Sequence, residues 1–190
     1  MRRILALAAG LALAAAPALA EETETETLQL DKGQTHVTVG TEDGPVDITR
    51  VMTPCALNKG YLQPMSPVEG IEPVGELEVL EALETGETVV VDMRTVEWRV
   101  RATIPGSVHI PYTEVASRLD ELGCAKAGEG WDCTDAKAFI GFCNGPVCPQ
   151  SPMAMKAAVR EGFPAEKIGY YRGGMLAWQA LGFTTLEGMF

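Results

Sequence analysis

Short apolar runs alternate with segments of helical character, and this alternation constrains the fold more than any other feature of the sequence. The runs are rich in β-branched or aromatic side chains, as is typical of strands buried on both faces: Val89–Asp92, Ala138–Phe142 and Ile168–Tyr171. The segments with helical spacing or capping residues are 76–84, 113–122, 151–162 and 175–181. Ser151 is the expected cap of the third helix, with Pro152 in its first position. Alternating strands and helices favour a mainly parallel sheet with helices on both faces, so we predict an α/β fold.

The first twenty residues have the organisation of a secretory signal peptide. A basic start (1–3) is followed by an apolar run (4–16) and by the small-x-small sequence Ala18-Leu19-Ala20. The apolar run is too short for a comfortable membrane span. We therefore expect residues 1–20 to be a signal peptide that is cleaved after Ala20. The mature protein is then periplasmic if the source is Gram-negative, and it is not attached to a membrane.

The charge balance excludes several classes of partner. The chain carries 15 Lys and Arg against 26 Asp and Glu, a formal net charge of -11. Loss of Arg2 and Arg3 with the signal peptide makes the mature chain more acidic still. An acidic surface repels nucleic acid and anionic lipid, so neither is an expected partner.

Residues 21–70 read as an N-terminal extension, partly disordered with short strands, that precedes one compact domain over residues 71–190. The extension opens with the acidic, low-complexity sequence EETETET, and two alternating segments, HVTVG and VDITRV, predict short strands joined by the turn TEDGP. From residue 53 the chain is rich in proline and glycine and has no periodicity, up to a boundary near Gly70. A protein partner that docks on residues 21–70 is one hypothesis for this extension.

The cysteine count is unusual for an exported protein. The chain has five cysteines, so at least one of them is free, reactive or paired with another molecule. Cys124 and Cys133 bracket a glycine-containing loop and predict a structural disulfide. Cys55 is left over, and the sequence does not decide whether it is free, bound to a partner or paired at the Cys143 site.

The two histidines do not predict a metal site. His36 and His109 are isolated and lie far from any cysteine pair with zinc-ligand spacing, and His109 reads as a hydrogen-bonded core residue. We expect no metal and no organic cofactor.

Cys143 occupies the most reactive position that the predicted fold offers. It follows the strand that ends at Phe142 and precedes the helix expected from Ser151, and ligands bind at this carboxyl edge of a parallel sheet. The N–H groups of the loop and helix favour an anion and are expected to lower the pKa of the Cys143 thiol. Cys143 is therefore either a nucleophile or a buried structural cysteine.

Four motifs in order carry a family resemblance: VVVDMRTVEW, ATIPGSVHIPYTEV, the loop FCNGPVCPQSP and YYRGGMLAWQALGF. Together they resemble a rhodanese-like domain of the sulfurtransferase family over about residues 73–185. The resemblance implies that Cys143 takes sulfane sulfur from a donor such as thiosulfate, becomes a persulfide, and passes the sulfur to a thiol or cyanide. The implied partners are thus a small sulfur-containing anion or a protein thiol.

The composition of the loop agrees with this chemistry. No charged side chain lies between Cys143 and Gln150. The persulfide is expected to be held by backbone amides of the loop that consists of Asn144, Gly145, Pro146, Val147 and Cys148. A persulfide carries at most one negative charge, which amides can hold. A phosphate would favour an Arg fork, and the next arginine is Arg160.

The loop departs from the family pattern at one place. Many members have Arg and Ser five and six residues after the nucleophile, where this chain has Cys148 and Pro149. Cys148 is a candidate resolving thiol or redox partner of Cys143. Two other functions therefore stay open: a dithiol/disulfide redox module that uses both cysteines, and a non-catalytic binding module.

Four further residues are candidate supports for the site. The resemblance implies that Asp92, at the end of the central strand, orders neighbouring loops, with a general acid/base role as the alternative. Arg94 is either a second support or a solvated surface side chain. Arg172 is a candidate for steering an anionic donor, and Gly173 is expected to allow a tight turn into the last helix.

Overall fold

The computed structural model describes residues 27–28, 30, 33–51 and 60–188. The predicted signal peptide, the acidic residues after it and Cys55 lie outside the described residues. In the described part of the chain, no helix is long and apolar enough to cross a membrane.

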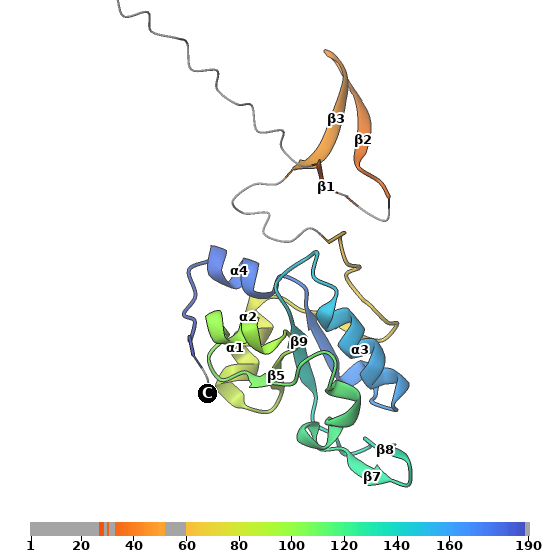
Figure 1. The fold of residues 1–190 in the computed structure, drawn as a ribbon, viewed down its shortest axis with the longest axis vertical. Helices are drawn as coiled ribbons and strands as arrows, with labels where there is room; N and C mark the ends of the chain where they lie inside the picture. The colour runs from red at the N-terminus through yellow and green to blue at the C-terminus, as the bar shows by residue number, and fades with distance from the viewer. Residues whose placement is uncertain (1–26, 29, 31–32, 52–59, 189–190) are drawn as a thin grey trace, which may run out of the picture.

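A five-stranded parallel sheet forms the centre of the main domain (Figure 1). Its order is β4 (Glu72–Pro73), β10 (Ile168–Tyr171), β9 (Phe139–Phe142), β5 (Val89–Asp92) and β6 (Val108–His109), and all neighbouring pairs are parallel. Asp92 pairs with Phe142 in the register of β5 and β9. Cys143 therefore leaves the sheet at the edge where β5 ends.

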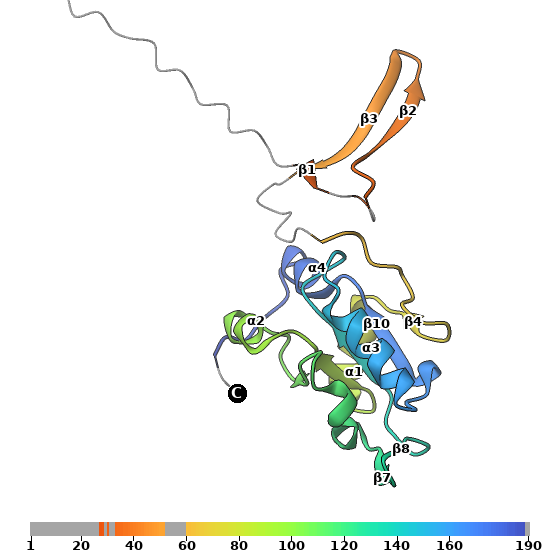
Figure 2. The same cartoon turned by 45° about the vertical axis from the view of Figure 1, so that its right-hand side comes forward.

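Helices cover both faces of the sheet, as the α/β prediction requires (Figure 2). Val91, Phe139 and Tyr170 pack against α3 (Gln150–Arg160) and two 3₁₀ helices, η1 (Val115–Ser117) and η2 (Leu119–Leu122). The adjacent residues in the same three strands are Val90, Ile140 and Tyr171, and their side chains point to the opposite face of the sheet. They pack against α1 (Glu76–Thr85) and α4 (Gly174–Ala180). Each strand is thus buried on both faces, which explains its continuous apolar sequence.

The structure differs from the expected elements in several places. The helix expected over 113–122 is the pair η1 and η2, and α3 begins at Gln150, so Ser151 lies inside its first turn instead of capping it. The sequence patterns also missed β4, β6, the six-residue α2 (Val96–Arg101) and the 3₁₀ helix η3 (Ala165–Lys167). Elements this short span too few residues to show a periodicity.

The extension contains the two predicted strands. β2 (His36–Thr41) and β3 (Gly44–Val51) form an antiparallel hairpin, and β1 (Thr27–Leu28) pairs with β3. This small sheet is separate from the five-stranded sheet (Figure 1).

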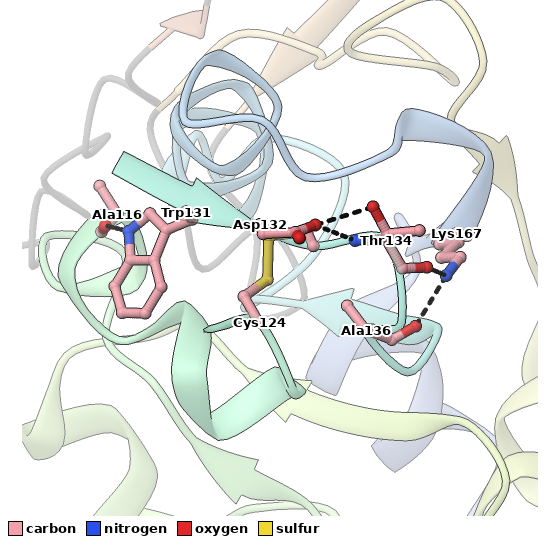
Figure 3. Close-up of a disulfide and its surroundings, with 8 residues drawn as sticks. Ala116, Cys124, Trp131, Asp132, Thr134, Ala136 and Lys167 are labelled. Atoms are coloured by element: carbon pink, nitrogen blue, oxygen red, sulfur yellow. Dashed lines mark hydrogen bonds between the residues drawn. A yellow bond between two sulfur atoms is a disulfide. The ribbon is translucent and has the colours of Figure 1, made fainter. Parts of the chain in front are cut away.

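Cys124 and Cys133 form the predicted disulfide, which closes the base of a second hairpin (Figure 3). The hairpin consists of β7 (Ala125–Ala127) and β8 (Gly130–Asp132), and both half-cystines are buried in the core. On either side, the Trp131 indole donates to the Ala116 carbonyl at 3.0 Å and the Lys167 ammonium donates to the Ala136 carbonyl at 2.9 Å. The disulfide therefore joins a small hairpin to the core beneath it.

Replacing both half-cystines by alanine is expected to lower the free energy of unfolding by about 2–3 kcal/mol, because the unfolded chain loses the restraint of a closed short loop. Urea unfolding of the Cys124→Ala/Cys133→Ala chain beside the natural chain measures the change. An unchanged midpoint and slope would contradict it.

Candidate active site

The cysteine loop is held from one side by the start of α4. The Met175 N–H donates to the Cys143 carbonyl at 3.0 Å, and the Leu176 N–H donates to the Asn144 carbonyl at 2.9 Å. Gly174 has φ +54°, and a Cβ atom there would collide with the Cys143 carbonyl oxygen. Glycine at 174 therefore lets α4 approach the loop closely enough to donate these hydrogen bonds.

The predicted Gly173 lies in the turn before α4, as expected, but its own φ is -56°. A Cβ atom on Gly173 would lie 2.8 Å from the Cβ of Ala177. Gly173 is thus needed for close packing, while Gly174 adopts the left-handed conformation of the turn.

Cys143 and Cys148 come together in the loop as two buried thiols. In the described part of the chain they are the cysteines without a disulfide. The Cys143 thiol donates to the Cys148 carbonyl at 3.3 Å, and the Cys148 thiol donates to the Gln150 side-chain oxygen at 3.7 Å. The Ser151 hydroxyl donates to the Cys143 Sγ at 3.0 Å. The two thiols therefore lie in one buried loop, where each affects the acidity of the other.

The two thiols differ in acidity. Burial raises the pKa of Cys143 well above its usual value, and the hydrogen bond to Cys148 adds to this. The pKa of Cys148 is lowered to about 7, mainly by the hydrogen bond from the Cys143 thiol and further by the Gln150 and Asn144 amides and the Arg94 charge. Cys148 is therefore the more acidic of the two thiols, and Cys143 keeps its proton at neutral pH. This differs from the expected lowering at Cys143, because the loop amides of Asn144 and Gln150 face the other sulfur.

Asp92 and Arg94 form a buried ion pair that reaches the cysteine loop. The Arg94 guanidinium donates to both Asp92 carboxylate oxygens, at 2.9 and 2.6 Å, and to the Asn144 side-chain oxygen at 3.3 Å. Thr103 donates a further hydrogen bond to Asp92 at 2.7 Å. Arg94 is 2% exposed, so the reading of it as a solvated surface residue is wrong. The pair connects the end of β5 to the loop, as expected of supporting residues.

His109 supports the same region. Its Nε2 lies 2.8 Å from the Arg94 carbonyl oxygen, so it is hydrogen-bonded as expected. The ring lies at the end of β6 and is only partly buried, so His109 is not the core residue that the sequence suggested.

Residues 60–63, which belong to the N-terminal extension, lie across the cysteine loop. The Gln63 N–H donates to the Pro146 carbonyl at 2.8 Å, and Gly60 packs so closely on the Val147 carbonyl that a Cβ atom would collide with it. Arg172 donates from its Nε to the Gln63 carbonyl at 2.8 Å. Arg172 thus holds residues 60–63 in place through this hydrogen bond. The sequence had suggested a different role for Arg172, the steering of an anionic donor.

A cavity of about 280 Å³ lies over Cys148. Among the described residues its lining has aromatic, apolar and amide side chains and no charged one. The lining residues are Gly60, Trp98, Tyr112, Asn144, Val147, Cys148, Pro149, Gln150 and Met153. Gly145 and Pro146 do not line it. A reactant in the cavity meets Cys148 before it reaches Cys143.

Ser151 and Tyr170 were not identified as site residues from the sequence. The Tyr170 hydroxyl is buried near Ser151 and Cys143, and no described atom completes a hydrogen bond with it. Burial raises the pKa of Tyr170, so the hydroxyl keeps its proton. The helical position of Ser151 beside a loop cysteine was the available signal, but Tyr170 is on a neighbouring strand and reaches the thiols through folding alone.

Removing Arg94 is expected to be far more destabilising than removing an exposed arginine. Arg94→Met leaves the Asp92 charge buried without its partner and should cost about 3–5 kcal/mol of unfolding free energy. The matched control is Arg118→Met, a more exposed arginine: it breaks the pairs with Glu114 and Glu121 and a hydrogen bond to the His109 carbonyl, and should cost about 1 kcal/mol. Equal losses in urea unfolding would contradict the buried-pair interpretation.

Alkylation should distinguish the two thiols. Because the thiolate is the nucleophile, iodoacetamide labelling of Cys148 should rise as pH increases through about 7 and level off above it, while Cys143 reacts much more slowly. Peptide mapping after timed labelling measures both rates. Faster labelling of Cys143 at neutral pH would show that the assignment is reversed.

Comparisons with known proteins agree with this architecture. The Rhodanese-like domain family matches residues 77–181. An HTH-type transcriptional regulator of Mycobacterium tuberculosis is 30% identical over 117 residues, which is 62% of this chain and 46% of the regulator. The chain thus spans about half the length of that curated relative.

Solved structures with similar folds include the BH2092 protein from Bacillus halodurans, at 20% identity and TM-score 0.49 over 62% of this chain and 77% of that one. A thiosulfate sulfurtransferase from Pseudomonas aeruginosa is 22% identical, with TM-score 0.49, over 61% of this chain and 20% of that one. The family match covers more than half of the sequence and contains the cysteine loop and every strand of the central sheet except β4. The chain therefore belongs to the rhodanese-like domain family.

Proposed function

We propose that this protein is a sulfurtransferase that moves sulfane sulfur from a donor such as thiosulfate to a thiol or cyanide acceptor through a persulfide on Cys143. The observation that carries this proposal is the Cys143–Cys148 thiol pair, held at the carboxyl edge of the sheet within the family's characteristic loop.

The pair provides a nucleophile together with a base. When Cys143 attacks the outer sulfur of thiosulfate, its proton passes to Cys148, whose pKa of about 7 makes the thiolate available as a base. The sulfur–sulfur bond of thiosulfate breaks, sulfite leaves, and a Cys143 persulfide anion remains. Because Cys148 lines the cavity and Cys143 lies behind it, the Cys148 side chain must turn aside while the donor reacts.

The buried hydroxyl of Tyr170 supports a persulfide at Cys143. A buried donor without an acceptor costs free energy, and such groups are uncommon in folded proteins. The added sulfur of a Cys143 persulfide would bring a negatively charged acceptor into the region that contains Tyr170 and Ser151. In the unloaded state the Tyr170 hydroxyl is thus a donor without an acceptor among the described residues.

The cavity favours a reactant of low charge. Its lining has no charged side chain among the described residues, and Arg94, the nearby cation, is already paired with Asp92. A phosphate dianion would lack the Arg fork that it normally requires. The acceptor is accordingly a small sulfur compound or a thiol, including a protein thiol presented near residues 60–63.

We further propose that the protein acts after export to the periplasm. The Cys124–Cys133 disulfide supports this, because disulfides persist in oxidising compartments. A protein partner that binds the 21–70 extension would sit beside the site, since residues 60–63 contact the cysteine loop.

A dithiol/disulfide redox module is the second candidate function. Two free thiols five residues apart on one loop favour it, because a loop can bring two cysteines within disulfide distance. The two functions differ in whether a sulfur atom is ever added to the chain.

Replacing Cys143 by serine should abolish sulfur transfer from thiosulfate and leave the fold intact. Intact-mass analysis with peptide mapping after brief thiosulfate exposure should show a gain of about 32 Da on Cys143 in the natural chain and none in Cys143→Ser. Sulfur transfer that persists in Cys143→Ser would refute the proposal.

Tyr170→Phe serves as a companion variant in the same assay. It removes only the hydroxyl, so stability should be unchanged or higher, while less persulfide accumulates because a donor to the added sulfur is lost. A loss of about 2 Da on the loop peptide with no preceding gain would favour the redox module instead.

A further inference from the structure

We propose that Cys148 resolves the Cys143 persulfide, so that the loop releases sulfide and closes a Cys143–Cys148 disulfide. This step rests on the proposed function, because the Cys143 persulfide is its substrate. It adds a second activity to the site: the protein releases the sulfur that it takes up when no external acceptor intercepts it.

The contact between Cys143 and Cys148 directs attack to the inner sulfur of the persulfide. The Cys143 Sγ lies 3.3 Å from the Cys148 carbonyl oxygen, and it is the atom that becomes the inner sulfur once Cys143 is loaded. Both thiols are free and buried in this loop. Thiol exchange depends on which sulfur the attacking thiol can reach. Attack on this atom breaks the sulfur–sulfur bond and expels the outer sulfur.

Burial favours Cys148 over an external acceptor. Cys143 is 1% exposed and is absent from the lining of the described cavity, whereas Cys148 lines it. An external thiol must therefore enter the cavity and pass Cys148 before it meets the persulfide. Cys148 belongs to the same loop and needs only to turn back, so the internal reaction has no cost of association.

The surroundings of Cys148 suit an attacking thiol. In the unloaded loop the Cys143 thiol is the main cause of the lowered pKa of Cys148. The amides of Asn144 and Gln150 and the Arg94 charge lower this pKa as well, and they remain in place after Cys143 is loaded. A thiol with a pKa near the ambient pH is the most effective attacker, because it combines thiolate population with nucleophilicity.

The step balances without an external oxidant. Cys148 carries the proton that it received from Cys143 during loading, and the Cys143 persulfide is an anion. Cys148 Sγ bonds to Cys143 Sγ, the bond from Cys143 Sγ to the outer sulfur breaks, and the outer sulfur leaves with the Cys148 proton as hydrosulfide. The two cysteines are oxidised to a disulfide, and the sulfane sulfur is reduced to sulfide.

The product loop needs a dithiol reductant before it can react again. Two thiols of the reductant reduce the Cys143–Cys148 disulfide and become a disulfide themselves. Each released sulfide therefore consumes one dithiol, and the reaction that must follow this one is thiol–disulfide exchange with a dithiol protein or small dithiol.

The test is a single turnover of the full mature chain without oxygen. The protein is reduced, separated from the reductant, exposed to thiosulfate and separated again. Sulfide is then measured over time while peptide mapping follows the loop. We expect the persulfide to decay into a Cys143–Cys148 disulfide, with a loss of about 2 Da, and sulfide to level off at about one per chain.

Cys148→Ser and Cys148→Ala are the informative variants. Each should retain the gain of about 32 Da on Cys143 and release sulfide about tenfold more slowly or not at all, because no second thiol is present in the loop. Results are expressed per persulfide formed, so slower loading does not affect the comparison. Cys55→Ser is the matched control: it removes another cysteine of the chain and should release sulfide like the natural protein.

Three outcomes would overturn the inference. Equal sulfide release from the Cys148 variants would show that another group resolves the persulfide, and a stable persulfide in the natural chain would show that none does. Persulfide on Cys148 in a Cys143→Ser chain would reverse the two roles. If neither the natural chain nor the Cys148 variants gain sulfur on Cys143, the proposed function itself fails, which is a distinct result.

Discussion

The site depends on the buried ion pair between Asp92 and Arg94. Asp92 is the last residue of β5, and Arg94 donates to both Asp92 and the Asn144 side chain of the cysteine loop. One guanidinium therefore connects the central sheet to the loop that contains the thiols. A charge buried without its partner is costly, and this cost holds both residues in a single arrangement. Arg94 also contributes positive charge near Cys148. Structural support and tuning of the thiol acidity therefore come from the same side chain.

The acidities of the thiols follow from where each sulfur lies. Cys143 is surrounded by the core and holds its proton, while Cys148 faces amides and the open cavity. Cys148 is therefore the more acidic thiol of the two. The usual argument that a loop cysteine is activated by its own amides does not fit Cys143, because the amides of Asn144 and Gln150 act on its neighbour.

The N-terminal extension contributes to the site through backbone contacts. Gln63 and Gly60 contact the carbonyls of the cysteine loop. Arg172, which is distant in sequence, donates a hydrogen bond to the Gln63 carbonyl. The same segment connects toward the hairpin, since the Leu62 N–H donates to the Leu30 carbonyl at 3.2 Å. A partner bound to the β2–β3 hairpin would therefore be connected, through this hydrogen bond, to residues 60–63, which lie across the cysteine loop.

The sequence alone determined the α/β class, the exact bounds of β5 and β10, the Cys124–Cys133 pairing and the loop that contains both thiols. Strands buried on both faces, glycine stops and cysteines that bracket a turn are local patterns, so they can be read without coordinates. Only the tertiary structure decided which thiol is acidic, that Arg94 is buried, that Arg172 binds Gln63 and that Tyr170 lies beside the thiols. Those properties depend on burial and on contacts between residues distant in sequence, which no local pattern records.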